Sequence, residues 1–306
     1  MKYLKNFYQN SQINLRPIFN ELVSDFLKIK NDYIFLLIAS LGVLLRLVHL
    51  SQPIKGDETA TFIYYVEPLN PLRVFIYTNP NNHVLHTILT KISTSLFGNS
   101  VVAMRIPSLL ASIGIIYFVY AVCKRFGHNG AFGALTTAIW PYLIAYSNNS
   151  RGYSLFCLLS LILVYIYIIS RAHFNNFALI LIALISSFGI FTMPTFIFIT
   201  LGIYIWISID HYFFISEKRN GILEINLLLI LFTFLFSVIL YLPVFFLSPN
   251  GYLSVVNNKN IINRSLSFES YVHQIFPHIR KSLIEISQML PNFYIFILLI
   301  LFFLGL

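Results

Sequence analysis

Long apolar runs alternate with short polar segments along the chain, and this pattern predicts a series of membrane-spanning helices. Residues 177–209 contain no Asp, Glu, Lys or Arg. As one helix they would extend about 50 Å, well beyond a hydrocarbon core of about 30 Å. We therefore predict two spans separated by a hairpin at Met193-Pro194. The other predicted spans cover residues 33–50, 100–122, 130–147, 153–170 and 225–247, and an eighth apolar run covers 292–306.

The polar segments between these runs divide the chain. Residues 1–32 mix acidic and basic side chains, which indicates a cytoplasmic leader or an interfacial helix. The transmembrane domain is expected over residues 33–306, with a first external loop at 51–99 and a second, rich in Asn, Ser and His, at 248–290. The eighth run has 15 residues where about 20 are needed to span. We therefore expect the sequence to be a truncated form of a longer protein.

Composition supports the membrane assignment and narrows the class of function. Hydrophobic residues make up 58% of the chain and charged residues only 10%, whereas soluble domains carry roughly 25% charged residues. The net charge of +9 comes from basic residues that lie mainly in loops and at span ends. This distribution predicts orientation in the membrane by the positive-inside rule and no nucleic-acid partner. Cys123 and Cys157 show no metal or redox spacing and are expected to be packing thiols.

The basic loops predict which end of each span faces the cytoplasm. Lys124-Arg125, Arg171 and Lys218-Arg219 all fall on the inner side if the leader is cytoplasmic. The first external loop then emerges on the other face. We expect a multi-pass protein of the plasma membrane with its chemistry on the extracytoplasmic face.

Two adjacent carboxylates, Asp57 and Glu58, follow the first predicted span by about seven residues. They could form an ordinary solvated pair. An acid held at a membrane face between apolar segments instead loses solvent, which raises its pKa toward that of a useful base. The residue pattern leaves both readings open.

Two arginines and two histidines are further candidates in the polar segments. Arg105 lies about one turn inside the second predicted span, and Arg151 lies at a tight turn between two spans. Either guanidinium could hold a phosphate by paired hydrogen bonds, or Arg105 could extend to the membrane surface. His83 and His86 would share one face of a helix. With the two carboxylates they could bind a divalent metal, or they could be structural histidines, and we assign no metal.

Taken in order, several motifs resemble the GT-C class of membrane glycosyltransferases. The resemblance is to the family-39-like group, which includes protein O-mannosyltransferases and the aminoarabinose transferase of lipid A, and it covers roughly residues 33–210. The matching motifs are Gly56-Asp57-Glu58, Asn82-His83-Val84-Leu85-His86, Phe97-Gly98-Asn99, Arg105-Ile106-Pro107-Ser108 and Ser147-Asn148-Asn149-Ser150-Arg151-Gly152-Tyr153-Ser154. Many relatives have His-Pro-Pro at His83-Val84-Leu85 and an acid at Asn149, so this chain departs from the pattern there.

The resemblance implies an all-helical fold with about eight transmembrane helices and short amphipathic helices along the membrane face in the first external loop. It implies transfer of a sugar from a polyprenyl-phosphate donor to a hydroxyl of an extracytoplasmic lipid, glycan or protein. Asp57 would be the general base, and Glu58 would support it or bind sugar or acceptor. The remaining expected substrate contacts are Asn82, His83, His86 and Tyr153, with Arg105 and Arg151 at the donor phosphate.

Two other functions compete with the enzyme. A polytopic transporter or flippase would place ionisable groups near the middle of its spans, whereas the predicted spans after Val122 contain almost none. This contrast favours chemistry at the membrane surface. A non-catalytic, lipid-binding relative would share the same motifs, and the sequence does not separate it from an active enzyme.

Overall fold

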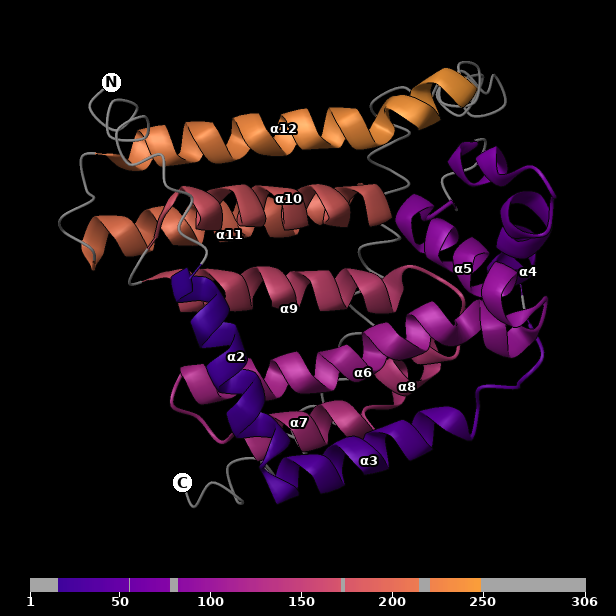
Figure 1. Cartoon of the computed structure of the whole chain (residues 1–306), viewed down its shortest axis with the longest axis horizontal. Coiled ribbons are helices and arrows are strands. Elements are labelled where there is room, and N and C mark those ends of the chain that lie inside the picture. Colours follow the sequence, from indigo (N-terminus) through magenta and orange to yellow (C-terminus); the bar gives the residue numbers. More distant parts are fainter. Residues whose placement is uncertain (1–15, 55, 78–81, 172–173, 215–220, 249–306) are drawn as a thin grey trace, which may run out of the picture. The chain divides into compact units, whose positions relative to one another are not determined.

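The computed structural model describes residues 16–54, 56–77, 82–171, 174–214 and 221–248, and all regular secondary structure within these ranges is helical. Most of the longer helices lie side by side in a bundle (Figure 1). Consecutive bundle helices run in opposite directions, so their connections fall at two ends of the bundle. The bundle helices are α3 (Tyr33–Leu47), α6 (Val101–Arg125), α7 (Gly130–Ile139), α9 (Tyr153–Ser170), α10 (Asn176–Thr192), α11 (Phe196–Phe213) and α12 (Ile222–Leu247).

Shorter elements occupy the two ends of this bundle. Helix α2 (Arg16–Lys30) crosses one end, where it packs against α9 and α3 (Figure 1). The opposite end carries α4 (Gly56–Thr61), the π-helix η1 (Phe62–Val66), the 3-10 helix η2 (Pro71–Phe75), α5 (Val84–Phe97) and α8 (Pro141–Ser147). Helix α5 packs against α6 and α10. The short helices expected for the first external loop are therefore present.

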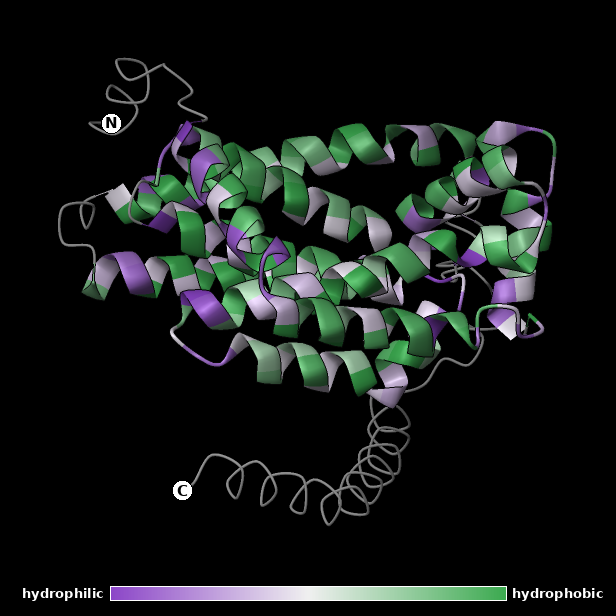
Figure 2. Cartoon of the chain, turned by 60° about the horizontal axis from the view of Figure 1, so that its bottom comes forward, coloured by the Kyte–Doolittle hydropathy of each residue, from purple (hydrophilic) through white to green (hydrophobic). Residues whose placement is uncertain are grey.

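Four of the described helices, α6, α9, α11 and α12, are long and apolar enough to cross a membrane. Helices α3, α7 and α10 are apolar but shorter. Hydrophobic residues cover the bundle helices along their length, and hydrophilic residues are more frequent at the two ends (Figure 2). The all-helical class is confirmed, and the total of eight spans stays a prediction. Residues 1–15, the loop at 249–290 and the run at 292–306 lie outside the described residues.

The predicted hairpin at Met193-Pro194 is confirmed. Helix α10 ends at Thr192, and Met193 has the extended backbone that a following proline favours, with φ −147° and ψ 125°. Gly189 lets the two helices approach closely at this hairpin. A Cβ atom on Gly189 would lie 2.2 Å from Cδ1 of Phe196, so a larger residue there would displace the start of α11.

The predicted span over residues 130–147 is not one continuous helix. It breaks at Trp140, whose backbone is extended, and resumes as α8 at Pro141. Proline has no backbone N–H, so the carbonyl of Thr137 has no partner four residues later. The side chain of Arg46 from α3 supplies the missing donors, with Nη2 3.3 Å from the carbonyl of Thr137 and Nη1 3.0 Å from that of Ala138.

Arg46 is fully buried and was not singled out by the sequence. Its Nε also donates to Oγ of Ser112 at 2.7 Å, and its Nη1 donates to the carbonyl of Gly42. The guanidinium thus caps the last turn of α7 and ties α3 to α6 and α7. Arg46 has a packing and capping role in the part of the chain that the structure describes.

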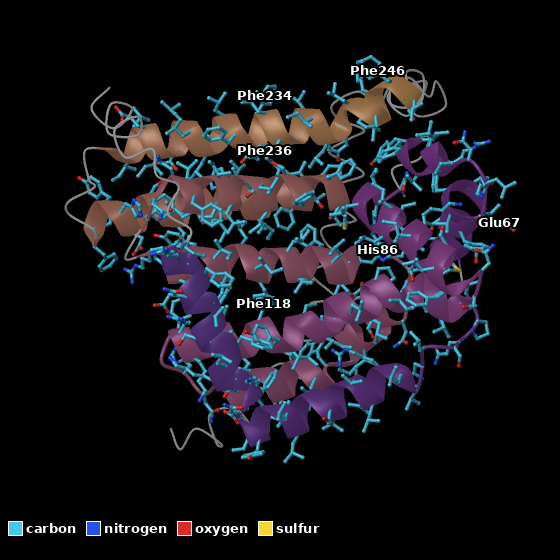
Figure 3. The ribbon with its side chains drawn as sticks, in the orientation of Figure 1. Glu67, His86, Phe118, Phe234, Phe236 and Phe246 are labelled. Carbon is cyan, nitrogen blue, oxygen red and sulfur yellow. The ribbon has the colours of Figure 1, made fainter. Side chains whose placement is uncertain are left out.

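Helix α12 covers the outer side of α10. Phe236 extends from α12 toward α10, whereas Phe234 points away from the bundle and is 64% exposed (Figure 3). A large exposed aromatic on an apolar helix suits contact with lipid rather than water. One face of α12 therefore packs on the bundle and the other is available to hydrocarbon.

Candidate active site

The two predicted carboxylates lie in the first turn of α4 and face different surroundings. Gly56 begins this helix with a φ of 46°, a left-handed conformation that suits glycine. The side chain of Asp57 is 63% exposed, whereas that of Glu58 is 4% exposed. The adjacent acids therefore have separate environments, and Asp57 is the one that solvent or a substrate can reach.

Glu58 forms a buried, two-point ion pair with Arg105 of α6. Nε of Arg105 donates to Oε1 of Glu58 at 2.8 Å, and Nη2 donates to Oε2 at 2.7 Å. The backbone N–H of Ser150 donates to the same Oε1 at 2.9 Å. Glu58 therefore joins α4 to α6 and to the loop that precedes α9.

The remaining N–H groups of Arg105 bind backbone carbonyls of the loop that follows α3. Nη1 donates to Leu50 at 2.9 Å and to Gln52 at 2.6 Å, and Nη2 lies 3.4 Å from the carbonyl of Pro53. The five N–H groups of this guanidinium thus have five acceptors inside the protein. The phosphate role expected for Arg105 is untested and stays a prediction. These contacts favour a role in positioning α4.

Arg151 approaches Asp57 from the loop between α8 and α9. Its guanidinium is 3% exposed, and Nη2 lies 3.9 Å from Oδ2 of Asp57. Nη1 contacts the Oγ1 of Thr61 at 3.2 Å, and the guanidinium lies 5.9 Å from the ring centre of Tyr153. The backbone of Arg151 is fixed by Ser108, whose hydroxyl donates to the Arg151 carbonyl at 3.1 Å. A buried cation is thereby held against an exposed carboxylate.

His83 stands beside this guanidinium, and its proton can be placed from its hydrogen bonds. The backbone N–H of Gly152 donates to Nδ1 of His83 at 2.8 Å, so Nδ1 is unprotonated. A neutral ring then carries its proton on Nε2, which lies 3.4 Å from Nη2 of Arg151. Both nitrogens are donors and cannot bond to each other. Nε2 of His83 and Nη2 of Arg151 are thus two neighbouring N–H donors, an arrangement that suits the binding of an anionic oxygen.

Burial lowers the pKa of His83 to about 4, and the nearby positive charge of Arg151 acts in the same direction. The ring of Tyr153 packs edge-on against His83, with centroids 5.2 Å apart. A Cβ atom on Gly152 would lie 2.9 Å from Nδ1 of His83, so glycine is needed for this approach. His83 is therefore a neutral donor at physiological pH.

Asn82 and His86 lie behind these residues and are engaged within the protein. The amide of Asn82 donates to the carbonyls of Val74 and Ile76, and its Oδ1 accepts from the hydroxyl of Thr87. These bonds connect η2 to the first turn of α5. The substrate contact expected for Asn82 stays untested, and its bonds indicate a structural role.

His86 is 1% exposed and lies on the side of α5 that faces α6 and α9 (Figure 3). Its Nε2 is 2.8 Å from Oγ of Ser108, and its Nδ1 is 3.3 Å from Oγ1 of Thr90. Burial lowers its pKa to about 3. Its substrate contact likewise stays a prediction.

The histidines do not fit a metal site. Nδ1 of His83 and both ring nitrogens of His86 are already hydrogen-bonded, so little ligand capacity remains. Within the described ranges, no group of three His, Cys, Asp or Glu side chains is arranged to hold a metal ion.

A cleft of about 530 Å³ lies beside Glu58 and Arg105. Its volume is within the range of small-molecule sites. One wall is the apolar side of α8, and the others are polar groups that follow α3 and α8. The lining residues are His49, Gln52, Pro53, Glu58, Arg105, Pro141, Ile144, Ala145, Asn148 and Asn149.

Comparison with known protein families decides the class of this chain. A family model described as dolichyl-phosphate-mannose-protein mannosyltransferase matches residues 82–246, more than half of the chain. The chain belongs to this family. A search of curated proteins and a search of solved structures each found no match.

Membership in the mannosyltransferase family, a GT-C family, makes this protein a membrane glycosyltransferase, in agreement with the resemblance of its motifs. The family match begins at Asn82, so Asp57 and Glu58 lie before it. The fold nevertheless brings both acids against residues inside the matched region. Glu58 bonds to Arg105 and Ser150, and Asp57 lies against Arg151. The predicted residues thus form two adjacent groups rather than one.

The pKa of His83 gives a prediction for the dependence of stability on pH. Unfolded histidine binds a proton below a pH of about 6.5, whereas folded His83 resists protonation down to about pH 4. The contribution of His83 to the free energy of unfolding is therefore fully present above pH 6.5, and it is lost as the pH is lowered toward 4. The contribution lost is on the order of 3 kcal/mol. Melting temperatures of the purified protein in detergent at pH 7 and 4.5 measure it.

The variant His83→Asn isolates this contribution, because an asparagine oxygen can accept the Gly152 N–H and does not titrate. We expect a smaller loss of melting temperature between pH 7 and 4.5 than in the parent. His128→Asn, at an exposed histidine outside the site, serves as the control and should match the parent. Equal acid sensitivity of His83→Asn and the parent would contradict the assignment.

Proposed function

We propose that this protein transfers a sugar from a polyprenyl-phosphate donor to a hydroxyl group of an extracytoplasmic lipid, glycan or protein. Asp57 is the general base in this proposal. The observation that carries it is the exposed carboxylate of Asp57 held against the buried guanidinium of Arg151, at one end of an apolar bundle. In this proposal, the lipid-borne donor and the acceptor hydroxyl meet at this end of the bundle.

The proposed reaction follows from the groups at the site. The acceptor hydroxyl gives its proton to the Asp57 carboxylate as its oxygen bonds to C1 of the sugar. The bond between C1 and the phosphate oxygen breaks, and its electron pair stays with the departing polyprenyl phosphate. Charge on that phosphate grows as the bond breaks, and Arg151 and the Nε2–H of His83 are placed to stabilise it.

The other predicted residues support this arrangement. Glu58 and Arg105 fix α4 and the loop after α3, so that Asp57 keeps its place relative to Arg151. Tyr153 packs against both Arg151 and His83. The cleft lined by Glu58 and Arg105 has a volume suited to a sugar or acceptor group, and Glu58 is the neighbour of the proposed base in the sequence. We propose positioning roles for Glu58 and Arg105 and contact roles for Arg151 and His83.

The proposed side of the membrane follows from charge. Arg125 and Arg171 lie at the end of the bundle that α2 crosses, and Asp57 and Arg151 lie at the other (Figure 1). Basic residues favour the cytoplasmic face. We therefore propose that the site faces the extracytoplasmic side of the plasma membrane, in a multi-pass chain. Dolichyl phosphate mannose, the donor in the name of the family, is the first to test.

Donor binding tests the proposal at Arg151. We expect the purified chain in nanodiscs to bind polyprenyl-phosphate mannose, and Arg151→Gln to bind it roughly 10- to 150-fold more weakly. A charge-assisted hydrogen bond contributes about 1.5–3 kcal/mol, which corresponds to that range. Fluorescence competition with a labelled polyprenyl phosphate measures both dissociation constants.

The matched control is Arg73→Gln, which removes an exposed cation from η2 at the same end of the bundle. Its donor affinity should equal that of the parent. Equal affinity of the Arg151→Gln protein and the parent would reject the phosphate role. Failure of the parent to bind any polyprenyl-phosphate sugar would reject the donor class itself.

A further inference from the structure

The cleft lined by α8 and the loop after α3 contains polar atoms whose hydrogen-bonding capacity is not met inside the protein. Asn148 and Asn149 both form part of its lining. Oδ1 of each residue is buried, and neither oxygen accepts a hydrogen bond within the ranges that the structure describes. Buried polar atoms in folded proteins are nearly always hydrogen-bonded, so two orphaned oxygens at one cleft indicate donors that a ligand supplies.

The orientation of the Asn148 amide is fixed by its own hydrogen bonds. Nδ2 donates to the carbonyl of Ile144 at 2.9 Å and to Oγ of Ser147 at 3.1 Å. An exchange of Oδ1 and Nδ2 would place one oxygen against the carbonyl oxygen of Ile144. Oδ1 is therefore the atom of this side chain that remains without a partner.

Asn149 is the freer of the two acceptors. Its side chain is half-buried and forms no hydrogen bond with any other residue that the structure describes. The terminal torsion of an asparagine side chain has broad minima. This amide can therefore turn its oxygen toward a ligand without losing a bond, which makes Asn149 the better residue to test.

The other polar groups of the lining determine the charge of the ligand. Glu58 and Arg105 neutralise each other, and the N–H groups of Arg105 already have acceptors, so an anion finds no free donor there. Nε2 of Gln52 donates to Nδ1 of His49 at 2.8 Å, which leaves Oε1 of Gln52 as a third acceptor. A neutral His49 ring then carries its proton on Nε2 and adds one donor. The cleft thus has no net charge and more acceptors than donors.

From this arrangement we propose that the cleft binds an uncharged sugar ring, whose hydroxyl groups donate hydrogen bonds to Asn148 and Asn149. A sugar ring has hydroxyls at its edge and C–H groups on its faces. Pro141, Ile144 and Ala145 supply an apolar wall for one such face. As a substrate site the cleft rests on the proposed function, and the ring belongs either to the transferred sugar or to a glycan acceptor.

Other classes of ligand fit these groups less well. A phosphate or carboxylate would place its oxygens against oxygens, and a hydrocarbon chain would leave both asparagine oxygens without donors. A peptide backbone carries as many carbonyl acceptors as N–H donors, and its carbonyls would find few donors here. A sugar hydroxyl both donates and accepts, which matches a lining of several acceptors and one donor.

Binding of methyl α-mannopyranoside to the full chain in lipid nanodiscs tests the site, with saturation-transfer difference NMR as the measurement. Nanodiscs are chosen because a maltoside detergent would itself present sugar hydroxyls. We expect the parent to bind this glycoside and Asn149→Ala to bind it roughly 3- to 10-fold more weakly, the effect of one hydrogen bond. The matched control is Asn99→Ala, at an exposed asparagine between α5 and α6, which should bind as the parent does.

Deoxy analogues separate a hydrogen bond from a change in the shape of the cleft. Methyl mannosides that each lack one hydroxyl group are titrated against the parent and against Asn149→Ala. Removal of the hydroxyl that donates to Asn149 should weaken binding to the parent about as much as the substitution does. It should have little further effect in the variant. Equal losses in both proteins for every analogue would reject the contact.

Polyprenyl-phosphate mannose identifies the source of the sugar. Displacement of methyl mannoside by this donor places the transferred sugar in the cleft, and simultaneous binding of both places an acceptor sugar there. A parent that binds none of methyl mannoside, methyl glucoside and methyl galactoside would overturn the sugar site, even if the donor still binds. Binding of a methyl glycoside without binding of any polyprenyl-phosphate sugar would keep the sugar site and reject the proposed function instead.

Discussion

The substitution Asp57→Asn is expected to lower the rate of sugar transfer by roughly 10²- to 10⁴-fold, the usual contribution of a general base. Asparagine keeps the shape of the side chain but cannot accept the proton of the acceptor hydroxyl. Because Asp57 is 63% exposed and its carboxylate forms no short hydrogen bond among the described residues, the fold should tolerate the change. Melting temperature and membrane insertion are therefore expected to match the parent.

Mass spectrometry of lipids, glycans and proteins from cells that carry either form of the gene measures this effect whichever acceptor the protein uses. The product that is lost identifies the sugar and its acceptor. The matched control is Glu67→Gln, an exposed acid in the same loop that points away from the bundle (Figure 3). Normal product levels with Asp57→Asn, or equal losses with Glu67→Gln, would end the assignment of Asp57 as the base.

Removal of one partner of the Glu58–Arg105 pair is expected to cost the largest amount of stability. Glu58→Met leaves a buried guanidinium without its carboxylate, and such changes cost about 3–5 kcal/mol. It also frees the N–H of Ser150 in the loop that carries Arg151. The melting temperature should fall strongly, and sugar transfer should fall with it because α4 loses its attachment.

The double variant Glu58→Met/Arg105→Met separates the ion pair from the rest of the site. With both charges gone, no buried charge of this pair remains unpaired, so this protein should be more stable than Glu58→Met alone. A full double-mutant cycle on melting temperature, with Arg105→Met as the fourth corner, gives the interaction energy. An unaltered melting temperature in Glu58→Met would show that the pair does not hold α4.

The apolar runs of the sequence predicted the bundle closely because length and hydrophobicity are properties of the local chain. Helix α9 begins at Tyr153 and ends at Ser170, as expected, and the hairpin after Thr192 follows from an apolar run too long for one span. These features depend on neighbours in the sequence, which a pattern can show.

The hydrogen-bond and ion-pair partners of the polar side chains could not be predicted from local sequence patterns. Asp57 and Glu58 are adjacent and chemically alike, yet only the fold decides that one is exposed and the other meets Arg105, 47 residues away in sequence. Hydrogen bonding of His83 to the Gly152 backbone is equally non-local. The sequence therefore indicated the region of the candidate site, and the fold divided its residues into two groups.

Arg46 and Pro141 were missed, although both carried a signal. A charged residue inside an apolar span is costly unless it has partners, and a proline inside a predicted helix indicates a break. Taken alone, each feature only argues against a regular membrane-spanning helix. Only together do they indicate a break whose free carbonyls receive an arginine.

That mutual dependence has a consequence for how the sequence can diverge. If Arg46 were replaced first, the carbonyls of Thr137 and Ala138 would lose their donors. If the break were mended first, the buried guanidinium would lose two of its four acceptors and keep only Ser112 and Gly42. Either intermediate is expected to be less stable than both end points. In related chains the two features should accordingly be inherited or lost as a unit, far apart along the chain yet behaving as one heritable character.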